Sequence, residues 1–510
     1  MGLLNLWLKS KRKNKYEDTK KASGTFDNQL SDIDFYSQLA YMASISTSGI
    51  SRSGLFYYSA KLPYIATRFF RRVDFVAKMF NHDYSQACRI VGEKIKIPDI
   101  KALLLRLSNA LASGEDVSAF LARESYILSQ SYSGTYERKI DALKKWADAY
   151  VSLILTSALV TVMSVVTMMI GSVSVSFIIS ISAITILATL FGAWFLYNTA
   201  PRETINHSLP YHSSEQNRVR YLSRILLPIG GFLLLVMLIM KINPGYVMLA
   251  ASGFLFPVGL VAMTDDKKVR KRDTDISAYL RSLGGTMQAI GATAAEAMGR
   301  LDFRSLGTLS EDAKLLYTRL SAGVSPNLCW DRFVGETGSE LVNRSVRIFW
   351  DGVTLGGEPQ RVGNEASAFA MKISLLRQQR NQISLGFTWL TIVMHAVLVT
   401  LSTFVYEVFL SFSTLITTIV PQQSDGTMQS MSGMPSLGFF SSNGTELHLL
   451  HFMIILIVII LTIANAFSIY AVSGGHPSKL TFYLAITCAM SGLILVAVPP
   501  VVHVMFNAFK

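Results

Sequence analysis

Charged residues are scarce in this chain of 510 residues: they make up 16% of it, whereas hydrophobic residues make up 50%. Soluble globular proteins usually carry about 25% charged residues. Charge is absent altogether from 149 to 201, a run far longer than the roughly 20 apolar residues that one membrane-spanning helix needs. These two shortages exclude an ordinary soluble protein.

The sequence also lacks the motifs that carry familiar chemistry. It has no G-x-x-x-x-G-K-[ST] phosphate loop, no H-E-x-x-H, no C-x-x-C pair and no G-x-S-x-G. Alternating apolar and polar runs of the length of a β-strand are missing as well. We therefore expect an all-α protein that is not an enzyme and that binds no cofactor or metal.

The apolar residues gather in segments that are long enough to cross a membrane. We expect about seven transmembrane helices, of which the third is short and interrupted by Pro228, Gly230 and Gly231. They are two spans within 149–201, then 225–240, 246–263, 381–406, 447–478 and 480–509.

Lys and Arg fall almost entirely on one side of these spans. Of the 47 Lys and Arg residues, only Lys241 and Lys510 lie on the other side, and the 414–447 loop there has none. Basic residues favour the cytoplasmic side of a membrane protein. We therefore predict a multi-pass protein of the cell membrane with a cytoplasmic N-terminus. The net charge of +13 is then explained by the basic residues on the cytoplasmic side. Nucleic acid is therefore not an expected partner.

These patterns divide the chain into five parts. They are a basic tail (1–32), a cytoplasmic helical domain (33–145), four transmembrane helices (146–263), a second cytoplasmic helical domain (264–383) and three transmembrane helices (384–510) with the external loop 414–447. Asn443 begins an N-x-[ST] triplet in this loop and is a possible glycosylation site. The three cysteines provide no pair on the external side, so no disulfide is expected.

An internal repeat relates the two cytoplasmic segments at an offset of 243 residues. Arg89-Ile-Val-Gly-Glu93 matches Arg332-Phe-Val-Gly-Glu336, and Trp146 matches Trp389. We interpret the segments as two copies of one helical bundle. We expect structural turns at the matched glycine–glutamate pairs, which are Gly92, Glu93, Gly114 and Glu115 in the first copy and Gly335, Glu336, Gly357 and Glu358 in the second.

One basic cluster lies far along the chain from every span. Arg68, Arg71 and Arg72 alternate with phenylalanines, and a mixture of Arg and Phe on one helix is typical of a surface that contacts protein. The basic residues beside the spans, among them those just before the first and fifth, are instead expected to set the topology and to contact lipid headgroups.

In these features and in their order, the sequence resembles the type II secretion system F-domain family, and most closely its archaeal branch. Tyr41-Met-Ala-Ser-Ile-Ser-Thr-Ser-Gly-Ile50 looks like the opening of that branch's first block. Arg106-Leu-Ser-Asn-Ala-Leu-Ala-Ser-Gly-Glu-Asp116 and Tyr136-Glu-Arg-Lys139 look like its later motifs. The likeness extends from about residue 33 to the end of the chain, and its departure is the second block, where the opening around Gly291 is degenerate.

The resemblance implies an inner-membrane platform protein of a type IV filament machine, either an archaellum or an archaeal type IV pilus. Such a platform couples a hexameric secretion ATPase to the insertion of pilin-like or archaellin subunits into the filament, and it is expected to be a homodimer. We expect Arg68, Arg71 and Arg72 to contact the ATPase.

A transporter or channel with cytoplasmic regulatory domains is the alternative. It is supported by the repeat, by the interrupted third span and by three polar residues within spans, His395, Glu407 and Asn465.

Overall fold

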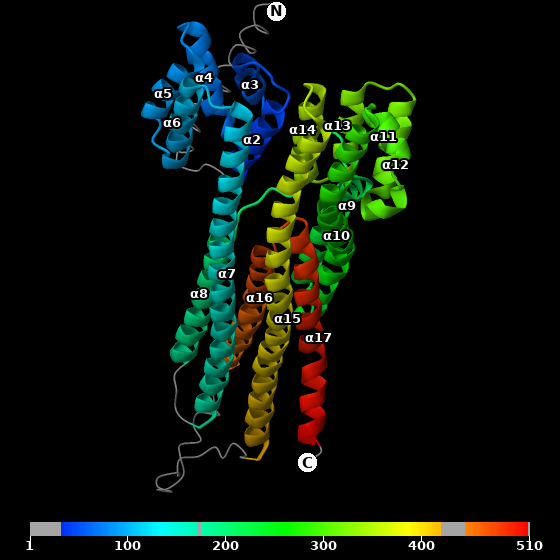
Figure 1. Cartoon of the computed structure of the whole chain (residues 1–510). Helices are drawn as coiled ribbons and strands as arrows, with labels where there is room; N and C mark the ends of the chain where they lie inside the picture. Colours follow the sequence, from blue (N-terminus) through cyan, green and yellow to red (C-terminus); the bar gives the residue numbers. More distant parts are fainter. Residues whose placement is uncertain (1–31, 171–174, 208, 420–443, 508–510) are drawn as a thin grey trace, which may run out of the picture. The chain divides into compact units, whose positions relative to one another are not determined.

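The computed structural model describes the whole chain except residues 1–31, 171–174, 208, 420–443 and 508–510. Across the described residues the regular elements are helices, without a β-strand (Figure 1). The prediction of an all-α protein is confirmed.

Seven helices within the described part of the chain are long and apolar enough to cross a membrane. This confirms the predicted number of spans and a multi-pass membrane protein. Pro228 lies inside the third of these helices without ending it. The seven are α7 (Val117–Ile170), α8 (Val175–Thr199), α9 (Ser214–Ile239), α10 (Pro244–Ile290), α15 (Pro359–Ile419), α16 (Gly444–Ser473) and α17 (Lys479–Asn507).

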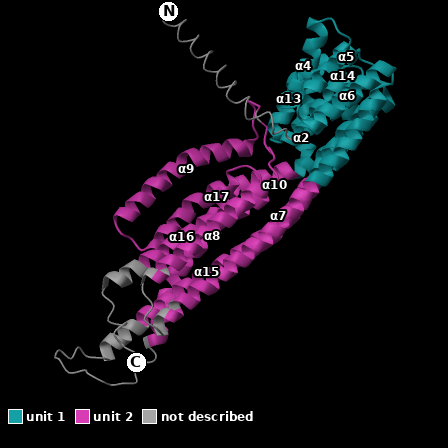
Figure 2. Ribbon diagram, turned by 90° about the vertical axis from the view of Figure 1, so that its left-hand side faces the viewer, with its two compact units in different colours: residues 1–135, 271–375 teal, residues 136–270, 376–510 magenta. Residues whose placement is uncertain are grey.

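The chain forms two compact units, each made of two separate stretches of sequence (Figure 2). Unit 1 comprises residues 1–135 and 271–375, and unit 2 comprises residues 136–270 and 376–510. Three of the long helices, α7, α10 and α15, contribute residues to both units.

Short helices make up most of unit 1. They are α2 (Asp32–Ser46), α3 (Arg52–Ser59), α4 (Thr67–Met79), α5 (Tyr84–Lys94), α6 (Pro98–Ser113), α11 (Ala294–Arg300), the 3₁₀ helix η2 (Phe303–Leu309), α12 (Ser310–Ser321), α13 (Pro326–Thr337) and α14 (Glu340–Thr354).

The helices of the two predicted copies follow one another at the offset that the sequence indicates. Moving α4, α5 and α6 forward by 243 residues places their first residues within one position of the starts of α12, α13 and α14. The same shift takes the start of α7 to within one position of that of α15. The two segments therefore share one helical plan.

Helix α2 ties the two copies together within unit 1. All of its residues except Asp32 are buried, as expected for a helix that is surrounded by protein. It packs on α14 of the second copy, where the Ser44 hydroxyl donates to the Ile348 carbonyl at 2.8 Å. Arg344 of α14 lies 2.8 Å from Asp34 of α2. The two copies thus share one core.

Unit 2 contains a polar network among its apolar helices. The Tyr150 hydroxyl donates to Asn465 Oδ1 at 2.8 Å, and Asn465 Nδ2 lies 3.0 Å from His395 Nδ1. His395 Nε2 lies 2.8 Å from the Ser491 hydroxyl. Buried polar groups are stable in apolar surroundings when they bind one another, and the network joins α7, α15, α16 and α17.

Candidate functional site

Helix α4 carries the three predicted contact arginines on one face. Its buried residues, which include Phe69, Phe70 and Val73, pack into unit 1. Opposite them a second set recurs at i, i+3, i+4, i+7 and i+11, the spacing that places side chains on one side of a helix. We call this set the α4 face, and it consists of Arg68, Arg71, Arg72, Phe75 and Met79.

The α4 face combines positive charge with exposed apolar surface. Phe75 and Met79 are 55% and 67% exposed, and Phe80 directly after the helix is 65% exposed. Arg72 is exposed, and the Arg71 guanidinium donates to the Ala60 carbonyl at 3.1 and 3.2 Å, which holds it at the surface. Arginine, methionine and aromatic residues are enriched in protein interfaces, so this surface suits a protein partner that is acidic and partly apolar.

The second copy does not reproduce this surface. On α12 the positions that match Arg68, Arg72 and Phe75 are occupied by Glu311, Leu315 and Thr318. Lys314, at the position of Arg71, keeps one of the three positive charges, whereas Glu311 reverses another. The two copies share a helical plan but differ in net charge at this point. A partner that recognises the α4 face would therefore distinguish the first copy from the second.

The predicted turns fall into two groups. Gly114 follows the end of α6 with a φ of +75°, and Gly356, next to Gly357, follows α14 with a φ of +92°. These two glycines lie in the turns before α7 and α15. Glycine suits both turns because it readily adopts a positive φ. The Gly357 and Glu358 pair begins one residue after the position that needs a positive φ.

The other matched pairs correct the turn prediction. Gly92 and Glu93 lie inside α5, and Gly335 and Glu336 lie inside α13. A Cβ at Gly92 would approach Leu104 Cβ of α6 to 3.3 Å, so this glycine allows two helices to pack closely. Glu336 accepts bonds of 2.6 and 2.8 Å from Arg319 of α12.

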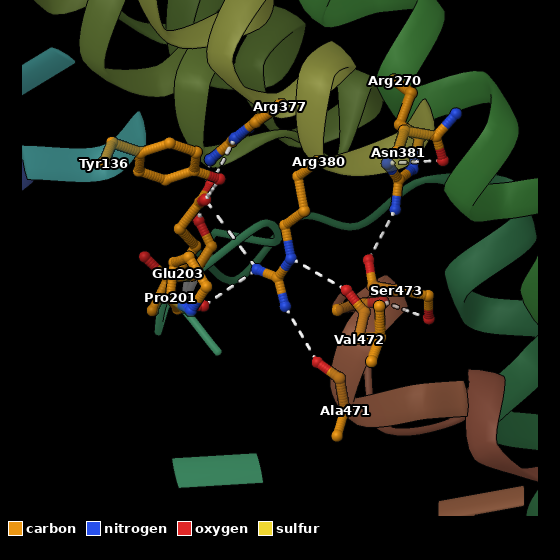
Figure 3. Close-up of polar contacts among 12 residues, drawn as sticks. Tyr136, Pro201, Glu203, Arg270, Arg377, Arg380, Asn381, Ala471, Val472 and Ser473 are labelled. Atoms are coloured by element: carbon orange, nitrogen blue, oxygen red, sulfur yellow. Dashed lines mark hydrogen bonds and ion pairs between the residues drawn. The ribbon is translucent and has the colours of Figure 1, made fainter. Parts of the chain in front are cut away.

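A buried group of charges lies in unit 2, where spans end (Figure 3). We call Glu203, Arg377 and Arg380 the arginine clamp. The Arg380 guanidinium donates to the carbonyls of Ala471 at 3.0 Å and Val472 at 3.1 Å, in the last turn of α16. The carbonyls at the end of a helix have no partner within the helix, and a cation there is also favoured by the helix dipole.

The clamp also holds the end of α8. Arg380 Nη1 donates to the Pro201 carbonyl at 2.8 Å, directly after α8. Arg377 Nε donates to Glu203 at 2.7 Å, and the Tyr136 hydroxyl donates to the same carboxylate. Arg377 and Arg380 are each 7% exposed. One segment of α15 is thereby fixed to the ends of two other spans.

Electrostatics keeps the carboxylate of the clamp ionised. Burial alone would raise the pKa of Glu203, but the guanidinium groups of Arg377 and Arg380 hold that pKa below its usual value. A buried charge is costly unless it is paired and hydrogen-bonded. The single negative charge therefore offsets part of the cost of burying two positive ones.

A neighbouring group extends these contacts to α10 and α17. Arg270 donates to Asp266 at 2.7 Å, to Asn381 at 3.1 Å and to the Ser473 carbonyl at 3.3 Å. The Lys479 ammonium lies 2.9 Å from Asp266 and is 2% exposed. Helices α10, α15, α16 and α17 are thus connected through charged groups at one level of unit 2.

Sequence reasoning missed the clamp. It assigned the basic residues before the fifth span to lipid headgroups, whereas Arg377 and Arg380 are buried among protein carbonyls and a carboxylate. Their spacing of three residues was the available signal, because it places both on one face of a helix. The predicted glycosylation site Asn443 lies outside the described residues.

Two curated proteins are similar to this chain. Flagella accessory protein J of Methanocaldococcus jannaschii is 28% identical over 312 residues, which are 58% of this chain and 55% of that protein. Flagella accessory protein J of Methanococcus voltae is 22% identical over 331 residues, 61% of this chain and 58% of that protein. The chain thus spans a little over half the length of each of these relatives. No protein-family model and no solved structure matches it.

Proposed function

We propose that this chain is a membrane platform protein of an archaellum or a related type IV filament machine, of the F-domain type. The observation that carries the proposal is the similarity to two proteins named Flagella accessory protein J. The seven spans and the repeated helical segments agree with it. In this role the protein performs no chemical reaction and binds no cofactor.

The protein lies in the cytoplasmic membrane with its N-terminus and unit 1 inside the cell. The distribution of Lys and Arg supports this orientation, because basic residues concentrate on the cytoplasmic side of spans. A cytoplasmic unit 1 places the α4 face within reach of a soluble motor. The α4 face then binds the hexameric secretion ATPase, because its arginines and exposed Phe75 and Met79 suit a large protein partner.

Motion of the ATPase is passed on through helices that are continuous over many turns. The 61 residues of α15 extend from unit 1 into unit 2, where Arg377 and Arg380 bind the ends of α8 and α16. A displacement of α15 would carry these spans with it. The moving spans, in a homodimer, lift pilin-like or archaellin subunits from the membrane into the filament.

Filament assembly in the intact cell tests this function. Deleting the gene should abolish surface filaments, and supplying the intact chain should restore them. The secretion ATPase should also be recovered when the chain is purified from cells that express both. Filaments that form normally without the gene would contradict the proposal, as would a chain that is recovered without the ATPase under conditions where both are expressed.

The transporter alternative predicts something different. Two of its supporting residues, His395 and Asn465, bind each other and Tyr150 and Ser491, as residues that hold helices together do. Solute uptake by vesicles that contain the purified chain would favour the alternative. Loss of filaments from cells that lack the gene, together with no uptake by such vesicles, would favour the platform.

A further inference from the structure

A polar pocket lies in unit 2 beside the first turns of α9. Its volume is about 220 Å³, which is below the roughly 300–1,000 Å³ of sites that enclose a drug-sized molecule. It is therefore of a size for an ion or a single headgroup. The pocket is lined by Asn206, His207, Gln216, Val219, Arg220, Ala262, Asp265 and His476; we call it the His207 pocket.

Groups that carry or can take up positive charge converge on this pocket. Arg220 and His476 are exposed at its wall, and His207 is 6% exposed. The His212 ring stacks on that of His207 with centroids 5.9 Å apart. Nδ1 of His212 is buried and has no hydrogen-bond partner within the described part of the chain. Three basic side chains, those of Arg220, His207 and His476, thus line the pocket, and His212 is connected to it through the ring of His207.

Only part of this charge is offset by nearby carboxylates. Asp265 is in the wall of the pocket and accepts a bond of 3.2 Å from the Ser213 hydroxyl. Asp266, its neighbour on α10, is bound to Arg270 and Lys479. Burial and the positive charge of Arg220 lower the pKa values of both His212 and His476. An anion in the pocket would relieve this repulsion between like charges.

The pocket residues adjoin the ends of candidate spans, where a membrane lipid would present its headgroup. Arg220 precedes the apolar part of α9 by about one turn, and the loop of His476 joins the ends of α16 and α17. Helix α9 is also the least covered span. In its most apolar stretch 6% of the residues are buried by protein, against 28–56% in the other six candidate spans of the described chain. Lipid beside α9 therefore has access to Arg220.

We propose that the His207 pocket binds a phosphate group, with Arg220 and His476 as its principal cationic contacts. Phosphate accepts several hydrogen bonds and is favoured by adjacent positive charges. The N-terminus of α9, capped by Ser213, adds the positive end of a helix dipole. The phosphate belongs to an anionic lipid headgroup or is free in solution. Neither source depends on the filament function proposed above.

Binding of defined probes to the full chain in a phosphate-free detergent tests the proposal. The probes are phosphatidic acid, phosphatidylglycerol, inorganic phosphate and, as a lipid without phosphate, diacylglycerol. Native mass spectrometry counts the bound molecules, and thermal unfolding reports stabilisation in the same samples. We expect the two anionic lipids, but not diacylglycerol, to remain bound to the intact chain.

Matched variants identify the site. Arg220→Gln and His476→Gln should each weaken binding of the anionic lipids by about tenfold or more, because each removes a charge-assisted contact. Arg218→Gln is the control, since Arg218 is exposed two residues away on α9 and should bind as the intact chain does. Equal binding by all three variants, or equal binding of diacylglycerol, would overturn the proposal.

The source of the phosphate follows from competition, and pH provides a second readout. Displacement of the lipid by millimolar inorganic phosphate assigns the pocket to free phosphate, and retention of the lipid assigns it to a headgroup. The positive charge of Arg220 lowers the pKa values of His212 and His476. A bound phosphate has the opposite effect and raises both pKa values. Affinity for phosphatidylglycerol, whose phosphodiester keeps one negative charge over this range, should therefore rise as the pH falls from about 7.5 to 6. An unchanged affinity of the intact chain for this lipid would contradict contacts through histidine.

Discussion

The Arg344 guanidinium and the Asp34 carboxylate, from different copies of the repeat, lie 2.8 Å apart in the core of unit 1. Arg344 also binds Glu340 at 2.9 Å and the Ser37 hydroxyl at 2.8 Å, and its charge lies 4.6 Å from the centre of the Tyr64 ring. Two segments that are far apart in sequence therefore depend on one buried cation.

Replacing Arg344 with methionine should destabilise unit 1 strongly. The change leaves two carboxylates without their partner in a buried place, which costs about 3–5 kcal/mol. We expect a lower unfolding temperature and faster proteolysis of residues in unit 1. Arg89→Met is the matched control, because the ion pair of Arg89 with Glu93 is exposed, and such pairs contribute about 0–1 kcal/mol. Equal effects of the two changes would contradict a shared core.

Charge reversal on the α4 face should remove the ATPase without removing the protein from the membrane. Changing Arg68, Arg71 and Arg72 to Glu places acid against an acidic partner, and like charges across an interface cost several kcal/mol. Co-purification of the ATPase should fall by about a hundredfold or more. The control reverses three exposed basic residues of the second copy, Arg300, Arg304 and Lys314. If only the control variant loses the ATPase, the second copy is the binding surface and the prediction is wrong.

Substitution at Gly474 should disturb the arginine clamp. This glycine has a φ of +62°, and a Cβ there would lie 2.7 Å from the Arg380 guanidinium carbon. Gly474→Ala must therefore displace Arg380 from the helix ends, and we expect reduced thermal stability and few filaments. Gly386→Ala, in α15 with no atom near the added Cβ, should behave as the unchanged chain or be slightly more stable.

The arginine clamp should also make the stability of the folded chain depend on pH. The pKa of Glu203 is lowered in the folded chain, so its ion pairs stabilise the fold above the unfolded pKa of about 4.5 and are lost as the pH falls through the folded pKa. Glu203→Gln should therefore be less stable than the unchanged chain at pH 7, with a difference that shrinks in acid. Thermal unfolding of both proteins between about pH 7 and pH 3 measures this difference. A constant difference would exclude the ion pair as its cause.

The turn at Gly114 provides a local test of the repeat. Valine at a φ of +75° is strained, because the left-handed conformation costs about 1–2 kcal/mol for a residue with a Cβ, and branching adds to this. Gly114→Val should lower the unfolding temperature and the number of filaments. Gly114→Asn should be milder, since asparagine tolerates this conformation. A Gly114→Val chain with normal stability and filaments would refute a structural role for the turn.

The spans were predictable because one physical requirement dominates them. A helix in lipid must be apolar along its whole length, so the charge-free run at 149–201 could be recognised without any knowledge of packing. The repeat was predictable because short motifs, such as Arg89-Ile-Val-Gly-Glu93 and Arg332-Phe-Val-Gly-Glu336, recur at one offset.

The contacts between segments were not predictable from the same patterns. Arg377 and Arg380 look like any arginines beside a span, and what decides their role is the position of the ends of α8 and α16. Gly92 looks like a turn residue, but it is needed where α5 and α6 pack closely. In both cases the deciding partner is remote in sequence, so local composition does not reveal it.

The partners of Arg380 in the two helix ends are backbone carbonyls, those of Pro201, Ala471 and Val472. Every amino acid supplies a carbonyl, so these three positions are free to change over evolutionary time without disturbing the bond. For these three bonds the arginine is the side chain that matters, whereas its charge also acts on the carboxylate of Glu203. Substitution at Pro201, Ala471 or Val472 therefore calls for no matching change at Arg380, and correlated mutation is not expected to reveal these three contacts.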